Sequence, residues 1–405
     1  MKPMSELRRT LGLPLLVLYG LGVTIGAGIF ALIGEIAGLA GDHAPLAFLI
    51  AGLVAAATGY SYAVLAAAFP RAGGEAVFVN MGLGANWARL VGLGVLLTAI
   101  ISSATITLAF AGYVTAIADV PRWAAIITMI SLLAALAAWG IRESVWFAAI
   151  ITILDMATLL IVIAVGIPHI DSADAARLMS LPADFNAIQG VIAASFLAFF
   201  AFIGFEDIEN MAEETVNPQR VLPRAIFLTL ILTVLIYAAI ATVAASVPGR
   251  EILPGNAAPL ASLFHLATGQ SGTPIATMAA IAMINGILVQ IMMGSRLIYG
   301  MAREGLVPAS IGAVNPWRRT PVRAIFILAV LIIILALTVP LKLLAEATSG
   351  VILAVFTLVN LSLWRIGSSP EAPPKLRRVR GWGIFAAILS AALLIFDVVS
   401  RQLNG

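Results

Sequence analysis

Residues 20–30 read Gly-Leu-Gly-Val-Thr-Ile-Gly-Ala-Gly-Ile-Phe, in the middle of an apolar run from about residue 11 to residue 40. Three glycines, Gly22, Gly26 and Gly28, fall within seven residues. Glycine weakens a helix by about 1 kcal/mol relative to alanine, and the run exceeds the roughly 20 residues that cross a bilayer. Two interpretations stay open: a small-residue face where another helix packs closely, or a helix that is discontinuous at membrane depth.

The second interpretation has a chemical consequence. An unwound turn inside a membrane must bury its backbone groups or line a wet cavity. Its free N–H groups, aided by the positive end of the following half-helix, would hold an anionic group such as a carboxylate. The stretch does not fit a dinucleotide site, because it lacks the G-x-G-x-x-G spacing and no βαβ pattern surrounds it.

The composition places the chain in a membrane. The mean hydropathy is +1.06, and only 11% of the 405 residues are charged, against about 25% in a soluble protein. The absence of cysteine excludes disulfides and thiol catalysis, and three separated histidines disfavour a metal site. No Walker-type motif occurs, so any transport would draw on gradients or exchange.

Hydropathy predicts eleven transmembrane helices in an all-α integral membrane protein. The expected spans are 11–40, 44–69, 91–117, 123–139, 146–167, 188–209, 224–247, 274–301, 324–339, 343–364 and 382–400. With the N-terminus inside, 18 of the 23 Lys and Arg fall on the inner side. The outer side then holds Arg122, Arg177, Arg250, Lys342 and Arg401. This asymmetry predicts a multi-pass protein of the cell (inner) membrane with a cytoplasmic N-terminus and an outer C-terminus.

Four sequence blocks carry a family resemblance. They are G-x-G-I-F at 26–30, the second-span ending at 62–74, F-F-A-F-I-G-F-E…A-E-E-T-V-N-P-Q-R-V-L-P-R-A-I at 199–226, and S-R-L-I-Y-G-M-A-R-E-G-L-V-P…T-P at 295–321. They resemble the amino acid–polyamine–organocation permeases, over about residues 12–325. The resemblance implies a 5+5 inverted repeat, the leucine-transporter-like fold, with helices 1 and 6 broken. It divides the chain into a ten-helix transport core (1–366), a cytoplasmic linker (367–381) and a peripheral eleventh helix (382–405).

The resemblance also implies where a substrate binds. The break in the first span, at Ile25, Gly26, Ala27 and Gly28, would bind an α-carboxylate through backbone N–H groups. The break in the sixth span would offer the carbonyls of Phe202, Ile203 and Gly204 to an α-amine, with Phe202 and Phe205 as an aromatic lid. Ser103 and Asn285 are further candidates for the pocket, although Asn285 fits a structural hydrogen bond equally well.

The chain departs from the family pattern at three places. Val64 replaces a glutamate, and Glu75-Ala-Val-Phe78 replaces a motif with two tyrosines, both near the inner end. In the fifth span, from Glu143 and Ser144 onward, Asp155 stands where family members carry a lysine that bonds to the carbonyl equivalent to Gly22. An ionised carboxylate cannot donate to a carbonyl. Asp155 is therefore protonated, or bridged by a sodium ion to the carbonyls of Gly22 and Ile25, or paired with a basic group.

Further acidic residues have more than one interpretation. Glu206 is a candidate proton carrier or partner for a cationic substrate, or a residue for coupling or proton sensing at the inner gate. Glu35 is a candidate proton carrier or partner for a cationic substrate, or a contact in an outer vestibule. The set Glu213, Glu214, Arg220, Arg224, Arg296 and Arg303 suggests a charged cytoplasmic gate, although a solvated loop fits as well.

These observations predict a secondary active transporter or exchanger of amino acids that works by alternating access, and not an enzyme. Apolar and aromatic stretches around the breaks favour neutral amino acids. The alternatives are a cationic amino acid or polyamine transporter, and a sensor that binds amino acids without translocating them. No organic cofactor is implied, and sodium or a proton would be the coupling ion. The expected partners are the small-molecule substrate and the lipid bilayer, with no nucleic acid and no obligatory protein partner.

Overall fold

The computed structural model describes residues 9–70, 74–140, 145–171, 180–303, 305–315, 317–318 and 320–404. Gly73, Glu143, Ser144, Arg177 and Glu304, which were named from the sequence or fall within its motifs, lie outside these ranges. Within the ranges the chain is helical and contains no β-strand, only an isolated bridge between Leu11 and Thr215. The prediction of an all-α protein is confirmed.

Fourteen named α-helices follow one another in the described residues. They are α1 (Leu13–Ile25), α2 (Gly28–Ala40), α3 (Ala44–Ala68), α4 (Gly74–Leu83), α5 (Ala85–Ile117), α6 (Arg122–Trp139), α7 (Val145–Gly166), α9 (Phe185–Phe199), α10 (Pro218–Ser246), α11 (Pro259–Thr268), α12 (Thr273–Arg303), α13 (Val322–Thr338), α14 (Leu341–Gly367) and α15 (Pro374–Asn404). The short 3₁₀ turns are η1 (Gly41–His43), η2 (Ile167–His169), η3 (Phe200–Phe202), η4 (Phe205–Met211) and η5 (Arg250–Ile252).

Proline and glycine mark many of the helix ends. Helices α1, α3, α10 and α11 carry a proline in their first two positions, where its missing N–H would be unpaired anyway and its fixed φ suits a helix. Helix α6 ends at Gly140 in the left-handed conformation, which glycine adopts without strain. Asp184 caps α9 by accepting a hydrogen bond from the Ala187 N–H at 2.7 Å.

Nine segments of the described residues are long and apolar enough to cross a membrane. One of them, Gly28–Ala68, has 41 residues and would be about 60 Å long as a single helix, twice the thickness of the hydrocarbon core. Gly41, with a φ of +55°, interrupts it between α2 and α3. Helices α1 and α13 are apolar but shorter. The count of eleven spans and the inverted repeat stay predictions.

The first and sixth expected spans are each interrupted, as the family resemblance implied. The first divides into α1 and α2 around Gly26 and Ala27. The sixth divides into α9, η3 and η4 around Ile203 and Gly204. These interruptions lie among buried residues.

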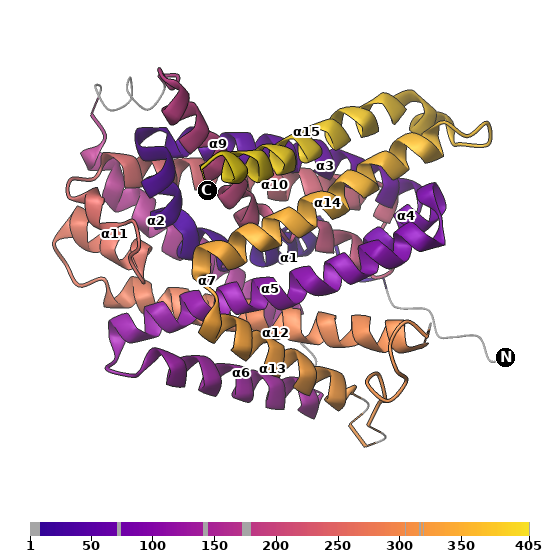
Figure 1. Cartoon of the computed structure of the whole chain (residues 1–405), viewed down its shortest axis with the longest axis horizontal. Helices are drawn as coiled ribbons and strands as arrows, with labels where there is room; N and C mark the ends of the chain where they lie inside the picture. The colour runs from indigo at the N-terminus through magenta and orange to yellow at the C-terminus, as the bar shows by residue number, and fades with distance from the viewer. Residues whose placement is uncertain are drawn as a thin grey trace.

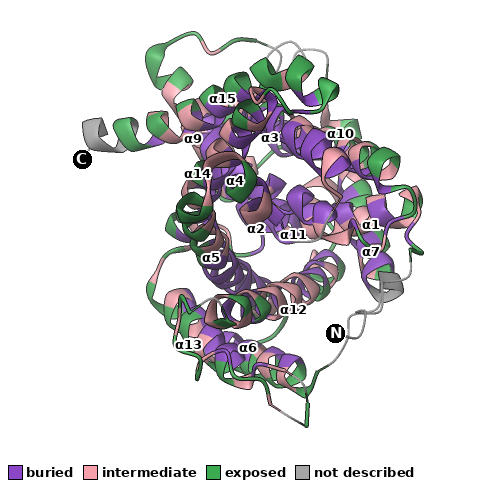
Figure 2. Cartoon of the chain, turned by 90° about the vertical axis from the view of Figure 1, so that its right-hand side faces the viewer, coloured by how far each residue is buried: buried purple, intermediate pink, exposed green. Residues whose placement is uncertain are grey.

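The interrupted helices lie at the centre of the molecule. In Figure 2 the buried residues gather on α2, α3 and the inner side of α5, while exposed residues gather on the outward faces of α6, α13 and α15. In the apolar window of α5, 72% of residues are buried, against 28% in that of α6. Helix α6 therefore offers most of its surface to lipid, and α5 is part of the interior.

The C-terminal helix differs from its predicted bounds. Helix α15 begins at Pro374 and not at residue 382, so that the connector after α14 spans only 368–373. Pro373 and Pro374 were predicted to be linker residues, whereas Pro373 caps the helix by accepting hydrogen bonds from the N–H groups of Leu376 and Arg377. Helices α4 and α11 were also missed, because ten residues are too few to give a membrane-span signal.

Helix α15 packs closely along α14 and reaches α3 (Figure 1). The Trp382 Nε1–H donates to the Ala57 carbonyl at 2.8 Å, and the Ser390 hydroxyl lies 3.3 Å from the Thr58 hydroxyl. Thr58 also accepts a hydrogen bond from the Asn360 amide of α14 at 3.0 Å. These buried polar contacts join the last helix to two helices of the predicted transport core.

This packing predicts a difference between two glycines of α15. A Cβ on Gly383 would lie 2.6 Å from the Asn360 carbonyl oxygen, whereas a Cβ on Gly381 would meet nothing within 4 Å. Gly383→Leu should therefore destabilise the protein by about 1–3 kcal/mol through overpacking. Thermal unfolding of the detergent-purified protein measures the change.

Gly381→Leu is the matched control and should leave the unfolding temperature unchanged or raise it, because leucine favours a helix over glycine. Equal behaviour of the two variants would show that α15 does not pack tightly on α14.

Candidate functional site: two crossed helix breaks

The first break exposes the beginning of a half-helix inside the molecule. Helix α1 ends at Ile25, and α2 begins at Gly28 with Ala27 as its N-cap residue. The first N–H groups of a helix have no partner within it, and those of α2 point back toward the break. Ile25, Ala27 and Gly28 are all buried. An unpaired helix N-terminus in such surroundings is suited to bind an anionic group.

The second break depends on one glycine and one glutamate. Ile203 is extended, and Gly204 has a φ of +121°, a conformation that residues with a side chain avoid. The Gly204 N–H donates to Glu206 Oε2 at 2.8 Å, and its carbonyl accepts from the Asp207 N–H at 3.1 Å. In the described part of the chain, no loop or cap hydrogen bond from a backbone N–H reaches the carbonyls of Phe202 and Ile203. Two of the three carbonyls expected to bind an amine thus remain available.

The two breaks lie against each other. A Cβ on Gly28 would lie 2.5 Å from the Ala201 Cα, and a Cβ on Gly204 would lie 2.9 Å from the Val23 carbonyl. Each break therefore uses a glycine to let the backbone of the other approach. The small residues of 20–30 consequently fulfil both interpretations from the sequence: they permit close packing, and they surround an interruption.

Tyr237 of α10 joins the two interrupted helices. Its buried hydroxyl lies 2.9 Å from the Ala201 carbonyl, 3.1 Å from that of Thr24 and 3.3 Å from that of Ile25. Its single hydrogen is therefore shared among carbonyls from both breaks. Tyr237 was not predicted, because one tyrosine in an apolar helix carries no spacing signal that would single it out.

The two phenylalanines expected to form one lid belong to different aromatic groups. The Phe202 ring packs 5.2 Å from that of Tyr237, which also contacts Phe48. The Phe205 ring packs 5.8 Å from Tyr62 and 5.4 Å from Phe356. Both rings are fully buried. The backbone turn at Gly204 separates them, so Phe202 faces α10 while Phe205 faces α3 and α14.

Asp155 lies behind the first break. Thr152, one turn earlier on α7, fills the space beside Gly22, where a Cβ would lie 2.1 Å from its hydroxyl oxygen. Asp155 is 2% exposed, and its Oδ1 has no hydrogen-bond partner among the described residues. It lies close enough to Tyr237 to interact with it electrostatically. The Thr24 hydroxyl is likewise buried and unpaired within the described ranges, so unsatisfied oxygen atoms gather beside the end of α1.

Ser103 and Asn285 lie on the packed helices α5 and α12. The Ser103 hydroxyl donates to the Ala99 carbonyl of its own helix at 2.7 Å. Asn285 Oδ1 is buried without a partner among the described residues. Gly286 faces Ile106, since a Cβ on this glycine would lie 3.8 Å from the isoleucine Cδ1. Asn285 therefore lies near the same stretch of α5 as Ser103.

Four carboxyl groups are buried at the predicted inner end of the second break. Glu206, Asp207 and Glu209 come from η4, and Glu75 comes from α4. A Cβ on Gly74 would lie 3.3 Å from Glu209 Oε1, which places α4 against η4. Burial raises the pKa of Glu75, which lies outside the apolar spans, so its neutral form persists to higher pH. Only Glu206 was predicted, because Asp207 and Glu209 read as ordinary loop residues.

Two of the predicted cytoplasmic gate residues, Glu214 and Arg303, make contacts outside the charged set. The backbone carbonyl of Glu214 accepts hydrogen bonds from the N–H groups of Thr10 and Leu11, and the Val216 N–H donates to the Leu11 carbonyl. The loop after η4 therefore holds the segment before α1. The Arg303 guanidinium lies over the ring of Tyr299 on its own helix, 5.9 Å from the centroid. A gating role for the charged set stays a prediction.

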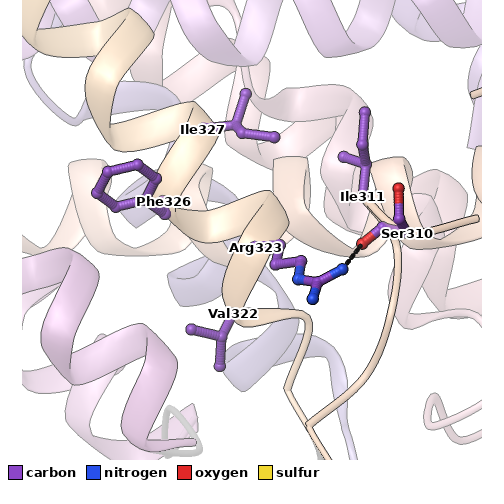
Figure 3. A pocket seen from close by; sticks show the side chains of 6 residues that line it. All are labelled: Ser310, Ile311, Val322, Arg323, Phe326 and Ile327. Carbon is purple, nitrogen blue, oxygen red and sulfur yellow. Dashed lines mark hydrogen bonds between the residues drawn. The ribbon is translucent and has the colours of Figure 1, made fainter. Parts of the chain in front are cut away.

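Two cavities lie away from the breaks. One, of about 440 Å³, is formed at the beginning of α13, where Arg323 donates to the Ser310 carbonyl at 3.2 Å beside Phe326 (Figure 3). The other, of about 650 Å³, is lined by Glu35 and lies at the predicted outer end. Glu35 therefore lines a cavity at the predicted outer end, and the structure does not bring it to the two breaks.

Comparison with known proteins decides the family. The family model for amino acid permeases matches residues 11–402. The chain belongs to the amino acid permease family. The permease is thus a multi-pass membrane transporter of the amino acid–polyamine–organocation superfamily and not an enzyme.

Three relatives illustrate the range of similarity. The permease is 32% identical over 399 residues to an uncharacterised transporter of Mycobacterium tuberculosis, covering 98% of this chain and 89% of the relative. It is 29% identical over 423 residues to the branched-chain amino acid permease BcaP of Bacillus subtilis, and the match covers 97% of this chain and 89% of BcaP. It is 29% identical over 408 residues to cationic amino acid transporter 4 of Mus musculus, and the match covers 92% of this chain and 63% of the mouse protein.

The position of Tyr237 predicts that its hydroxyl stabilises the permease. Tyr237→Phe keeps the aromatic packing but leaves buried carbonyls of both breaks without this donor. The expected loss of stability is about 1–3 kcal/mol, measured by thermal unfolding.

Tyr60→Phe is the control. The Tyr60 ring also packs against aromatic residues, Phe227 and Trp382, but its hydroxyl does not bridge the two breaks. A Tyr237→Phe variant as stable as Tyr60→Phe would refute the bridging role.

Proposed function

We propose that the permease carries neutral amino acids across the cell membrane by alternating access, as a secondary active transporter or exchanger. The observation that carries the proposal is the contact between two helix breaks: the beginning of α2 lies against Ala201, close to the carbonyls of Phe202 and Ile203, and these carbonyls accept no loop or cap hydrogen bond from a backbone N–H of the described residues. A zwitterion needs donors for its carboxylate and acceptors for its ammonium, and these breaks offer one set of each.

In this proposal the backbone binds the part that all amino acids share. The N–H groups of Gly26, Ala27 and Gly28 hold the α-carboxylate at the positive end of α2. The carbonyls of Phe202 and Ile203 accept from the α-ammonium, with a smaller contribution from Gly204, whose carbonyl already accepts one hydrogen bond. Exclusion of water from this buried place strengthens both sets of interactions.

The preference for neutral side chains rests on the surroundings of the breaks. Ile25, Phe202 and Phe205 are fully buried apolar residues beside them. The name of the Bacillus subtilis relative, a branched-chain amino acid permease, supports this class. Ser103 and Asn285 would supply the polar part of the pocket.

A cationic substrate is the second candidate, supported by the name of the mouse relative. Three acids could meet an additional positive charge, but each has another position or partner. Glu206 accepts from the Gly204 N–H, Asp155 lies behind α1 beside Thr152, and Glu35 lines the outer cavity. This arrangement favours the neutral class.

Asp155 is the proposed site of the coupling ion. Its unpaired Oδ1 and the carbonyls of Gly22 and Ile25 are oxygen ligands of the kind that unwound transporter helices offer to sodium. A protonated Asp155 could instead bind a carbonyl directly. Both versions make the occupancy of Asp155 part of the transport cycle, because the residue lies against the half-helix whose end forms the substrate site.

Counterflow uptake in proteoliposomes tests the substrate class. Vesicles are preloaded with unlabelled alanine, leucine, arginine or putrescine, and entry of the same labelled compound is followed with and without sodium. We expect uptake of alanine or leucine. Uptake restricted to arginine or putrescine would reverse the ranking, and binding without any uptake would favour a sensor that does not translocate its ligand.

The ion-coupling role predicts a specific effect of Asp155→Asn. The substitution keeps the shape of the side chain but removes its charge and its titration, so transport should lose its dependence on sodium or on pH. Initial uptake rates at several sodium concentrations and pH values measure this.

Asp184→Asn is the control, because asparagine caps a helix as well as aspartate does, and Asp184 caps α9 away from the breaks. An Asp155→Asn protein with an unchanged sodium and pH profile would refute the role of Asp155.

A further inference from the structure

The outer cavity is lined by residues that have no role in the proposed transport site. It has a volume of about 650 Å³ and lies between α2, α5, the beginning of α6, the loop at 255–257 and the turn between α13 and α14. All of these segments reach the side that the distribution of Lys and Arg assigns to the outside. Ala31 lies at its inner limit, three residues after Gly28, so the cavity begins one helical turn from the first break.

Two charged side chains of opposite sign line the cavity, Glu35 from α2 and Arg122 from α6. Neither forms an ion pair or hydrogen bond with the other or with any other residue in the described ranges. Their charged atoms are thus more than 4 Å apart across a common space. Opposite charges that face one cavity without pairing leave room for a ligand that carries both signs.

The beginning of α6 adds to the positive side. Helix α6 starts at Arg122, after Pro121, and its first N–H groups have no partner within the helix. The helix has 18 residues, and its dipole favours a negative group at this end. A carboxylate beside Arg122 would therefore meet a guanidinium and free backbone donors together.

The rest of the lining is mostly apolar and is held in a defined position. Buried Leu108 and Ile126 supply walls for a hydrocarbon side chain, and Trp123, which is 60% exposed, adds an aromatic face. The Tyr113 hydroxyl donates to the Phe30 carbonyl at 2.8 Å and accepts from the Leu260 N–H at 3.3 Å, which joins α5, α2 and α11. The absence of a side chain on Gly112 lets the Ala257 carbonyl approach α5 closely.

We propose that this cavity is a second binding site, distinct from the helix breaks, for the zwitterionic part of an amino acid. Arg122 and the N-terminus of α6 bind the α-carboxylate, Glu35 binds the α-ammonium, and Trp123 and its apolar neighbours contact the side chain. This second site rests on the proposed function in one respect, namely that the ligand is an amino acid. An amino acid held here lies one helical turn from the first break and can enter the transport site from it.

Equilibrium dialysis of the purified full-length protein with radiolabelled leucine tests the second site. The wild-type protein should bind two leucines per chain at saturation, and Arg122→Gln or Glu35→Gln should each reduce this to one. Arg122→Lys, which keeps the charge but loses the planar fork, should retain the site with an affinity about tenfold weaker. Thr338→Trp, which fills the cavity without changing a charge, should also reduce binding to one leucine per chain.

Glu251→Gln is the control for a lost outer acid, because Glu251 is exposed and does not line the cavity. It should still bind two leucines. Ile203→Trp, which obstructs the second break, should bind one leucine per chain. The double variant that combines Ile203→Trp with Arg122→Gln should bind no leucine. Thermal unfolding checks that each variant is folded.

The outcomes separate the two proposals. A wild-type protein that binds a single leucine, lost in Ile203→Trp and kept in Arg122→Gln, would overturn the outer site and leave the transport site intact. A single leucine lost in Arg122→Gln and kept in Ile203→Trp would retain the outer site and overturn the transport site. Absence of leucine binding to the folded wild-type protein would overturn both.

Discussion

The contact between two interrupted helices is the constraint on which the rest of the structure depends. Backbone groups that leave a helix inside a membrane find no water, so each needs a partner from the protein or a ligand. Here Tyr237 is a donor for carbonyls of both helices, and Glu206 accepts the N–H of Gly204. The N–H groups at the beginning of α2 and the carbonyls of Phe202 and Ile203, which accept no loop or cap bond from a backbone N–H of the described residues, are the groups that suit an amino acid.

The charged residues around this contact differ between the predicted inner side, the breaks and the predicted outer side. On the predicted inner side, Glu75, Glu206, Asp207 and Glu209 are buried, and burial is costly for ionised groups. Beside the breaks, Asp155 is the buried acid of α7. On the predicted outer side, acidic and basic side chains line the same cavity. On the proposed path, a ligand that enters from the predicted outer side meets both signs first and a nearly neutral, apolar region next.

The sequence predicted best the features that residues close together along the chain determine. The glycines at 22–28 permitted an interruption at Gly26, and the family resemblance implied a second one at Gly204, where glycine allows the φ of +121°. Predictions were weaker where a residue acts through a distant partner. Pro374 was interpreted as a linker residue although it opens α15, and Tyr237 was missed because its partners lie 36 and more than 200 positions away in sequence.

The sequence by itself determined that this chain belongs in a membrane, which spans are interrupted, and which family it resembles. The membrane assignment follows from hydropathy, whereas the family and the interrupted spans follow from motifs that resemble the permeases, with the weak helix propensity of glycine permitting the first interruption. Only the tertiary structure decided that the two breaks touch, that Phe202 and Phe205 face different aromatic groups, and that Glu35 shares a cavity with Arg122. Such relations join residues far apart along the chain, and the packing of helices, which no local pattern encodes, brings them together.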